Sequence, residues 1–279
     1  AHAFGRNAQA TGSSSTALGR DAVSAGLRSV SLGDSYASGT DSFAAAIANN
    51  TSSYGATGAN SIAMGSLAKA SGTFATSIGY GTQATAGNST SVGRSSVASG
   101  SQSLALGMSS NASGEKATAI GSNAKAEIYG KLAYAAADFG SSSIYSQTGT
   151  YVLLSDTTDA TAESLTTNRS TAAADNQVIL PNNSAYGFTG TIIARENSAA
   201  TNDFAVWEVK GGAVRAASAA TTALGSYNIN KISESTGAAA WAIAISADTT
   251  NGAIAFTVTG EASHSIRWVA TINTTEVTY

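Results

Sequence analysis

The chain has 279 residues, of which 11% are charged, and its formal net charge at neutral pH is −3. Residues 1–126 carry seven basic and four acidic residues, and residues 127–279 carry seven basic and thirteen acidic ones, so neither half has the basic surface that nucleic-acid binding requires. The absence of cysteine excludes disulfides and cysteine-bound metals. No apolar run is long enough to insert into a membrane.

Residues 1–126 repeat a pattern of fourteen residues. Six of the seven intervals between the anchor glycines are fourteen residues long, and these glycines are Gly5, Gly19, Gly33, Gly65, Gly79, Gly93, Gly107 and Gly121. A second glycine follows each of them after about seven residues in most copies, as Gly100 and Gly114 illustrate. Two evenly spaced glycines predict two tight turns with positive φ, separated by short strands. Because so short a unit cannot fold alone, the pattern predicts a β-roll of about nine stacked coils.

The residue before each anchor glycine is apolar, and we expect this row of side chains to line the interior of the roll: Phe4, Leu18, Leu32, Met64, Ile78, Val92, Leu106 and Ile120. One such side chain contributes roughly 1.5–3 kcal/mol when buried. Ordering fourteen residues costs on the order of 14–28 kcal/mol. The interior is therefore too thin for a free-standing roll, and we expect a homotrimer in which rolls share their apolar faces.

The pattern Ser-x-Ala-Leu-Gly-x-x-Ala-x-Ala-Ser-Gly resembles the head repeat of trimeric autotransporter adhesins of the YadA type. Its clearest copies begin at residues 61–65 and 103–107, and the resemblance covers residues 1–126. It implies a left-handed parallel β-roll and an obligate trimer.

The repeat ends after Ala126, and residues 127–147 are expected to form a connector rich in alanine and serine. Residues 148–279 contain longer runs in which apolar and small or polar residues alternate, at 186–195, 241–245, 254–258 and 266–272. Each run predicts a strand with one buried face. Turn signals separate them at Pro181-Asn182-Asn183, Lys210-Gly211-Gly212 and Asn251-Gly252. The second half is therefore predicted to be an antiparallel β-sandwich or jelly roll, in a chain that is all-β.

Phrases at residues 177–184, 246–252 and 267–271 resemble the C-terminal domain of tail fibres of marine and cyanobacterial bacteriophages. The resemblance covers roughly residues 131–279. It implies a trimeric fibre tip that touches the host surface.

Few residues suggest catalysis. His2 and His264 fall in different halves, no glycine loop is followed by the lysine of a phosphate-binding motif, and the candidates for a zinc site are too few. We therefore expect no enzymatic activity, no cofactor and no metal site. Asp156 and Asp159 lie in a threonine-rich segment that is predicted to be a solvated loop, with cation or sugar binding as the alternative.

Aromatic residues are the better candidates for receptor binding. Trp207 lies in a run with apolar residues on both faces, so one face is expected to pack in the core or against another subunit. Tyr227 and Asn228, and Tyr186 shortly after Asn182-Asn183, are candidates to stack on and hydrogen-bond a sugar. The alternative for each of them is an ordinary structural role.

These observations predict the distal part of a trimeric bacteriophage tail fibre or spike, located on the virion. The roll is its stiff shaft, and residues 148–279 are the tip that binds a host glycan or outer-membrane protein. The first coil offers an open sheet edge, so the attachment to the particle is expected outside this chain. Three alternatives remain: an adhesin head on a bacterial surface, a polysaccharide depolymerase with two close carboxylates in a groove, and a self-assembling surface filament.

Overall fold

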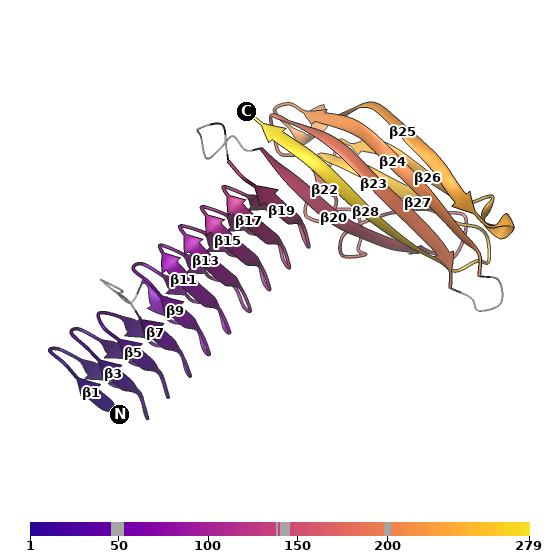
Figure 1. Cartoon of the computed structure of the whole chain (residues 1–279). Coiled ribbons are helices and arrows are strands. Elements are labelled where there is room, and N and C mark those ends of the chain that lie inside the picture. Colours follow the sequence, from indigo (N-terminus) through magenta and orange to yellow (C-terminus); the bar gives the residue numbers. More distant parts are fainter. Residues whose placement is uncertain (46–52, 138, 140–145, 198–201) are drawn as a thin grey trace. The chain divides into compact units, whose positions relative to one another are not determined.

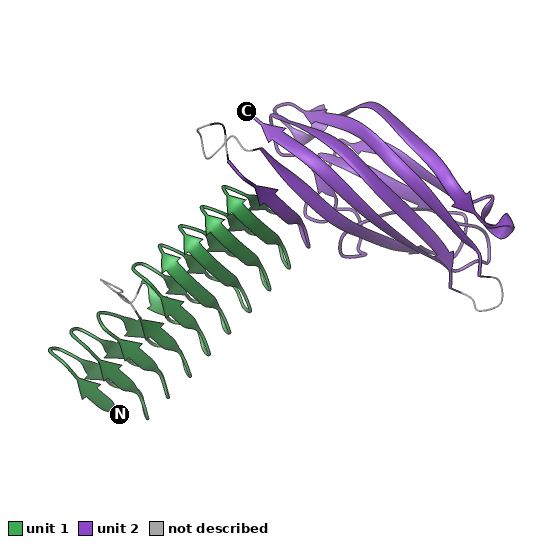
Figure 2. Ribbon diagram, in the orientation of Figure 1, with its two compact units in different colours: residues 1–127 green, residues 128–279 purple. Residues whose placement is uncertain are grey.

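The computed structural model describes the chain except for residues 46–52, 138, 140–145 and 198–201. It divides into two compact units, residues 1–127 and residues 128–279 (Figure 2). Within the described residues there are strands and two 3-10 helices, Ala219–Thr221 and Thr236–Ala238, but no α-helix. The prediction of an all-β chain is thereby confirmed. No helix in the described part of the chain is long and apolar enough to cross a membrane.

Unit 1 is a β-roll in which the chain passes alternately through two parallel sheets (Figure 1). One sheet contains β1 (His2–Phe4), β3 (Thr16–Leu18), β5 (Val30–Leu32), β7 (Phe43–Ala45), β9 (Ile62–Met64), β11 (Thr76–Tyr80), β13 (Thr90–Arg94), β15 (Leu104–Met108) and β17 (Thr118–Ser122). The other contains β2 (Gln9–Ala10), β4 (Val23–Ser24), β6 (Tyr36–Ala37), β8 (Gly55–Ala56), β10 (Lys69–Ala70), β12 (Gln83–Ala84), β14 (Val97–Ala98), β16 (Asn111–Ala112) and β18 (Lys125–Ala126). Equivalent residues pair in successive coils, as Ile78 does with Val92, so the predicted roll is confirmed.

Small side chains fill the interior of the roll. The middle residues of the first sheet's strands, such as Ala17 and Ala105, are fully buried, and so are Ala70 and Ala84 in the second sheet. The expectation that the apolar residue before each anchor glycine lines the interior is wrong: Leu18, for example, is 48% exposed. Successive residues of a strand point to opposite faces, so an inward alanine places both of its neighbours outward.

The two glycines of a coil have different roles. The anchor glycines adopt positive φ as predicted, for example +117° at Gly107. The second glycines do not: the positive φ of that turn lies two residues later, at Gln102 in the coil of Gly100. A Cβ atom on Gly100 would instead lie 2.0 Å from the carbonyl oxygen of Gly114 in the next coil. Close stacking of coils, rather than the φ angle, requires glycine there.

Unit 2 contains two antiparallel sheets. The larger has the order β19 (Leu132–Ala135), β20 (Ser146–Thr157), β28 (Ile266–Thr278), β23 (Ser184–Glu196), β24 (Phe204–Arg215) and β25 (Ala223–Glu234). In the smaller, β27 (Ala253–Thr259) pairs along one edge with β26 (Ala242–Asp248) and along the other with β21 (Ala162–Ser164) and β22 (Val178–Ile179). The C-terminal strand β28 thus lies between β20 and β23.

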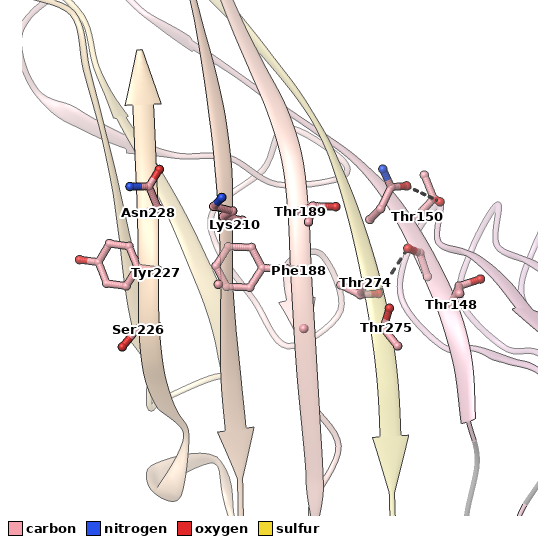
Figure 3. Close-up of a pocket in the computed structure, with 14 residues that line it drawn as sticks. Thr148, Thr150, Phe188, Thr189, Lys210, Ser226, Tyr227, Asn228, Thr274 and Thr275 are labelled. Atoms are coloured by element: carbon pink, nitrogen blue, oxygen red, sulfur yellow. Dashed lines mark hydrogen bonds between the residues drawn. The ribbon is translucent and has the colours of Figure 1, made fainter. Parts of the chain in front are cut away.

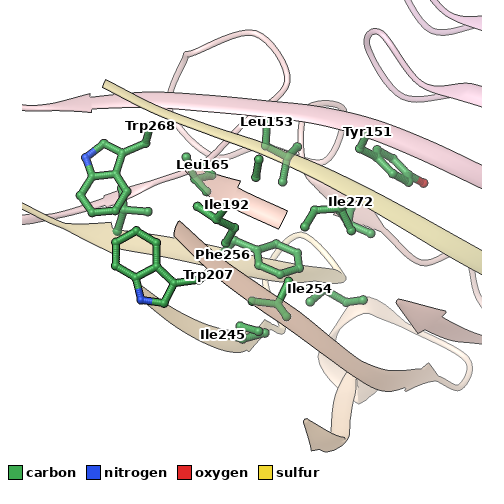
Figure 4. Packing of buried hydrophobic residues seen from close by; sticks show 14 of the residues in the cluster. Tyr151, Leu153, Leu165, Ile192, Trp207, Ile245, Ile254, Phe256, Trp268 and Ile272 are labelled. Atoms are coloured by element: carbon green, nitrogen blue, oxygen red, sulfur yellow. The ribbon is translucent and has the colours of Figure 1, made fainter. Parts of the chain in front are cut away.

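Large side chains between the two sheets form the core of unit 2 (Figure 4). Trp268 of β28 stacks on Trp207 of β24, with ring centroids 5.6 Å apart, and lies 6.0 Å from Trp241. Phe188 of the larger sheet meets Phe256 of the smaller sheet edge to face at 5.7 Å. The two sheets therefore pack face to face, as the predicted β-sandwich requires.

Two local predictions differ from the structure. Lys210-Gly211-Gly212 is no turn but lies inside β24, which shifts its register to β25 between Gly211 and Ala213. A Cβ atom on Gly211 would lie 2.8 Å from the ring of Phe188, so this glycine makes room for the ring. Within the expected connector, residues 132–135 form β19 and pair with β20.

Candidate functional site

The outer face of the larger sheet carries rows of polar side chains. Along β28, buried and exposed residues alternate without a break, and the exposed ones face away from the core. Strand register places one exposed residue from each of five adjacent strands in a single row: Thr150, Asn273, Thr189, Lys210 and Asn228. A neighbouring row holds Thr271, Thr191, Glu208 and Asn230. Residues far apart in sequence thereby form one continuous polar surface.

A groove of about 820 Å³ crosses this surface (Figure 3). We call it the outer groove, and its lining residues are Thr148, Gly149, Thr150, Gly187, Phe188, Thr189, Lys210, Gly211, Ser226, Tyr227, Asn228, Asn273, Thr274 and Thr275. At Gly187 no atom lies within 4 Å of the place that a Cβ atom would occupy. The missing side chain therefore leaves open space in the sheet surface. A second hollow of about 440 Å³ shares Thr189, Lys210, Asn228 and Asn273 with it.

The groove combines hydroxyl and amide groups, and the two aromatic residues of its floor, Phe188 and Tyr227, belong to a row of residues on the core-facing side of the sheet. Tyr227, on the edge strand β25, is 48% exposed and follows directly on Ser226 and before Asn228 (Figure 3). The hydroxyl of Thr150 donates a hydrogen bond to the Asn273 side-chain oxygen at 2.9 Å. Lys210 is the one charged residue that lines the groove. Such a surface can hydrogen-bond a polyol and attract a single negative charge.

The structure separates the residues that the sequence suggested for receptor binding. Tyr227 and Asn228 both line the outer groove. Tyr186 and Trp207, in contrast, are buried in the core of unit 2, and Lys231 Nζ lies 5.5 Å above the Trp207 ring. These two rings are not available to a receptor, because both occupy inward positions of their strands.

Asp156 and Asp159 lie apart from the outer groove, at the other end of β20 and beyond. Asp156 forms an ion pair with Arg169. Asp159 accepts a hydrogen bond from the backbone N–H of Thr161 at 2.7 Å, and this bond holds the pKa of the Asp159 carboxyl below its usual range. Among the described residues no three His, Cys, Asp or Glu side chains gather in a way that could hold a metal ion.

Sequence reasoning missed most of the residues that line the groove. Lys210 was assigned to a turn, Thr189 was taken only as a polar position of an alternating run, and Asn273 and Gly187 were not singled out for binding. The available signal was the enrichment of threonine, asparagine and glycine on the face opposite the core. Their convergence depends on the register of five strands, which the alternation does not specify.

Comparison with known proteins identifies the repeat of unit 1. The model of the YadA head domain repeat (2 copies) matches residues 3–22, 10–35, 56–82, 84–110 and 112–127. Residues 3–127 therefore carry repeats of the YadA head type, as their sequence predicted. No curated protein matches the chain. The resemblance of residues 131–279 to phage tail-fibre domains stays a prediction.

Two solved structures show weak similarity to the chain. One is the tailspike protein gp49 of Acinetobacter baumannii bacteriophage Fri1, with 9% identity and a TM-score of 0.28 over 76% of this chain and 39% of that protein. The other is the tailspike protein of Acinetobacter phage vB_ApiP_P1, with 10% identity and a TM-score of 0.27 over 92% of this chain and 49% of that protein. The chain spans less than half the length of either.

The Fri1 tailspike is a capsular polysaccharide depolymerase. This finding contradicts the expectation that the chain is not an enzyme, and that expectation is withdrawn. At a TM-score of 0.28 the likeness assigns neither a reaction nor a substrate to the chain.

Proposed function

We propose that the chain is the distal part of a trimeric phage tail fibre or spike, and that its outer groove binds a glycan of the host surface. The observation that carries this proposal is the groove itself. It offers threonine hydroxyls, asparagine amides and one lysine amine along a floor opened by glycine. A glycan is rich in hydroxyl groups, and the hydrogen-bonding groups that could recognise it sit here on rigid strands rather than on loops.

The roll supports this role as a spacer. Its strands pair from coil to coil, and small residues such as Ala63, Ala70 and Ala84 pack in the described part of its interior. In the proposed assembly, three rolls associate through their apolar faces and three outer grooves engage the same surface. Three weak sites that act together hold far more tightly than one.

Binding of the intact chain to immobilised host polysaccharide tests the assignment of the groove. The Gly187→Val variant introduces a side chain into open space and suits a strand, so it should fold normally yet bind at least about tenfold more weakly. Asn273→Ala removes a hydrogen-bonding amide from the groove and should weaken binding in the same way. Ser233→Val, on the outer face of β25 but outside the groove, is the matched control and should bind like the unmodified chain.

Equal binding by all three variants would show that the groove is not the receptor site. Reducing ends released from the polysaccharide in the same samples would show that the bound glycan is also cleaved.

The head repeats favour one further candidate, an adhesin on a bacterial surface. The two locations are separable by immunogold labelling, which should mark phage tails under the proposed function. Labelling of the bacterial envelope in phage-free cells would assign the adhesin role instead.

A further inference from the structure

Three polar side chains meet inside the sandwich of unit 2, on the core side of the sheet that carries the outer groove. Lys131 Nζ lies 2.7 Å from Glu276 Oε2. The side-chain nitrogen of Gln147 donates a hydrogen bond to the same oxygen at 2.6 Å. Lys131, Gln147 and Glu276 are 3%, 5% and 1% exposed, respectively. An amine, a carboxamide and a carboxylate thus share one oxygen atom out of contact with solvent.

Neighbouring residues leave space for the Lys131 side chain and contact its amine. A Cβ atom on Gly149 would lie 3.1 Å from Lys131 Cε and 2.3 Å from Glu276 Oε1, so glycine leaves the space that both side chains occupy. The rings of Tyr151 and Tyr186 lie 5.3 Å and 5.9 Å from Lys131 Nζ. Burial raises the pKa of Glu276, but the charge of Lys131 and the hydrogen bonds from Lys131, Thr274 and Gln147 together outweigh burial and hold the pKa of this carboxyl below its ordinary value. The resting cluster is therefore a buried ion pair, in which the second carboxylate oxygen, Glu276 Oε1, accepts hydrogen bonds from the hydroxyls of Thr274 and Tyr151.

We propose that Lys131 and Gln147 join in an intramolecular isopeptide bond, formed by the chain itself with Glu276 as the proton carrier. The ammonium group of Lys131 first gives a proton to Glu276 Oε2. The neutral Nζ then attacks Cδ of Gln147, and the Cδ–Nε2 bond breaks. Two of the three protons of the ammonium group end on Nε2, which leaves as ammonium, while Glu276 returns to a carboxylate. The product is a secondary amide between the two side chains, and no oxidant or cofactor is consumed.

The proton transfer from Lys131 to Glu276 runs uphill from the ion pair, so the neutral amine is a minor species and the first step limits the rate. Burial keeps out water that would compete with the amine. A desolvated lysine is a nucleophile, and a carboxyl group within hydrogen-bonding distance of both nitrogens can deliver the proton to the departing one. Holding the groups together in one cavity replaces the high concentration that the reaction requires in solution.

The bond closes the segment between residues 131 and 147. This segment contains β19, which pairs with β20, while Gln147 pairs with Glu276 of β28. The chain has no cysteine, so a disulfide cannot perform this function. The isopeptide bond would covalently connect the segment that contains β19 to β20 at the start of unit 2, as a disulfide does in other proteins.

Intact-protein mass spectrometry of the folded chain tests the proposal. The measured mass should fall below the mass calculated from the sequence by one ammonia. After denaturation, trypsin should not cleave after Lys131, because its amine is acylated. Digestion with chymotrypsin, which cuts at Tyr134 within the closed segment, should leave the peptides of Lys131 and Gln147 joined, and tandem spectra should locate the bond. A full-mass chain that trypsin cleaves after Lys131 overturns the proposal, and so does an ammonia loss located at another residue.

Three variants isolate the role of each group. Lys131→Arg and Glu276→Gln should each show the full calculated mass, the first for lack of a nucleophile and the second for lack of a proton carrier. Glu234→Gln is the matched control, because Glu234 also pairs with a lysine at 2.6 Å but lies at the surface. It should retain the cross-link. An ammonia loss that persists in Lys131→Arg contradicts the assignment, and the measurement on the unmodified chain remains decisive if a core variant fails to fold.

Discussion

At the scale of single residues, contact between neighbouring backbones decides which positions of the roll must be glycine. Gly100 has an ordinary φ angle, yet its missing side chain allows the next coil to approach. Gly87 looks equivalent in the sequence, but it lies one position late. There the nearest atom to an added Cβ would be the Thr73 carbonyl oxygen at 3.8 Å. Two glycines of the same repeat therefore differ in what they tolerate.

Alanine should lower the free energy of unfolding at Gly100 but not at Gly87. Gly100→Ala forces its methyl group onto the backbone of the next coil, and overpacking of this kind costs about 1–3 kcal/mol. Gly87→Ala meets only ordinary contacts and should leave the free energy of unfolding almost unchanged. Thermal or denaturant unfolding followed by circular dichroism measures both. Equal destabilisation by the two variants would contradict the close-stacking argument.

Asp248 should make the stability of unit 2 depend on pH. Burial raises the pKa of Asp248, but hydrogen bonds from Asn251 and Thr250 outweigh it and lower the pKa in the folded state. A group with a depressed pKa stabilises the fold above its unfolded pKa, and this contribution is lost as the pH falls through the folded value. Asp248→Asn should therefore reduce stability at pH 7 by about 1 kcal/mol and less below about pH 4. A deficit that is the same at both pH values would contradict this role.

At the scale of strands, alternation in the sequence predicted which segments are extended, but not how they assemble. The run at 186–195 became β23 and the run at 266–272 became β28. The glycine pair in β24 was wrongly predicted to be a turn. Glycine is required at position 211 because Phe188 and Tyr227 of the neighbouring strands occupy the space of a side chain, and the sequence alone does not show this contact. The outer groove could not be predicted either, because it also depends on which residues of neighbouring strands lie side by side. Tyr227 and Asn228 could be singled out from residue type, whereas Lys210 and Asn273 join them only through the register of the sheet.

Packing of the three tryptophans should contribute more than other contacts to the stability of the interface between the two sheets of unit 2. Trp268 stacks on Trp207 and donates a hydrogen bond from its indole nitrogen to the Thr157 hydroxyl at 3.0 Å. Trp268→Ala should lower the free energy of unfolding by about 3–5 kcal/mol, because it leaves a cavity and an unpaired hydroxyl. Chemical denaturation followed by the fluorescence of Trp207 and Trp241 measures the loss. A change below about 1 kcal/mol would show that the sheets are held together elsewhere.

At the scale of the whole molecule, the roll presents two unlike faces. On the sheet that begins with β1, the outward residues before the anchor glycines pair from coil to coil in an apolar ladder, which includes Met64 and Ile78. On the other sheet, the outward positions are mixed: they include Gln9, Lys69 and Gln83 but also Val23 and Val97. A continuous apolar ladder on an exposed face is typical of a surface that binds a partner. The ladder therefore supports the proposed homotrimer, in which each roll buries this face against two others.

Charges placed on the two faces should separate this assembly from folding. The double variant Met64→Asp with Ile78→Asp puts two carboxylates into the proposed interface and should convert the trimer into monomers or unfolded chain, as sedimentation velocity would show. The control Gln9→Asp with Gln83→Asp adds the same charge on the other sheet and should remain trimeric. Because each roll interior holds little more than alanine and serine, we expect the dissociated roll to lose its β-structure as well. A folded monomer of the unmodified chain at low concentration would contradict the trimer and assign the apolar ladder to a different partner.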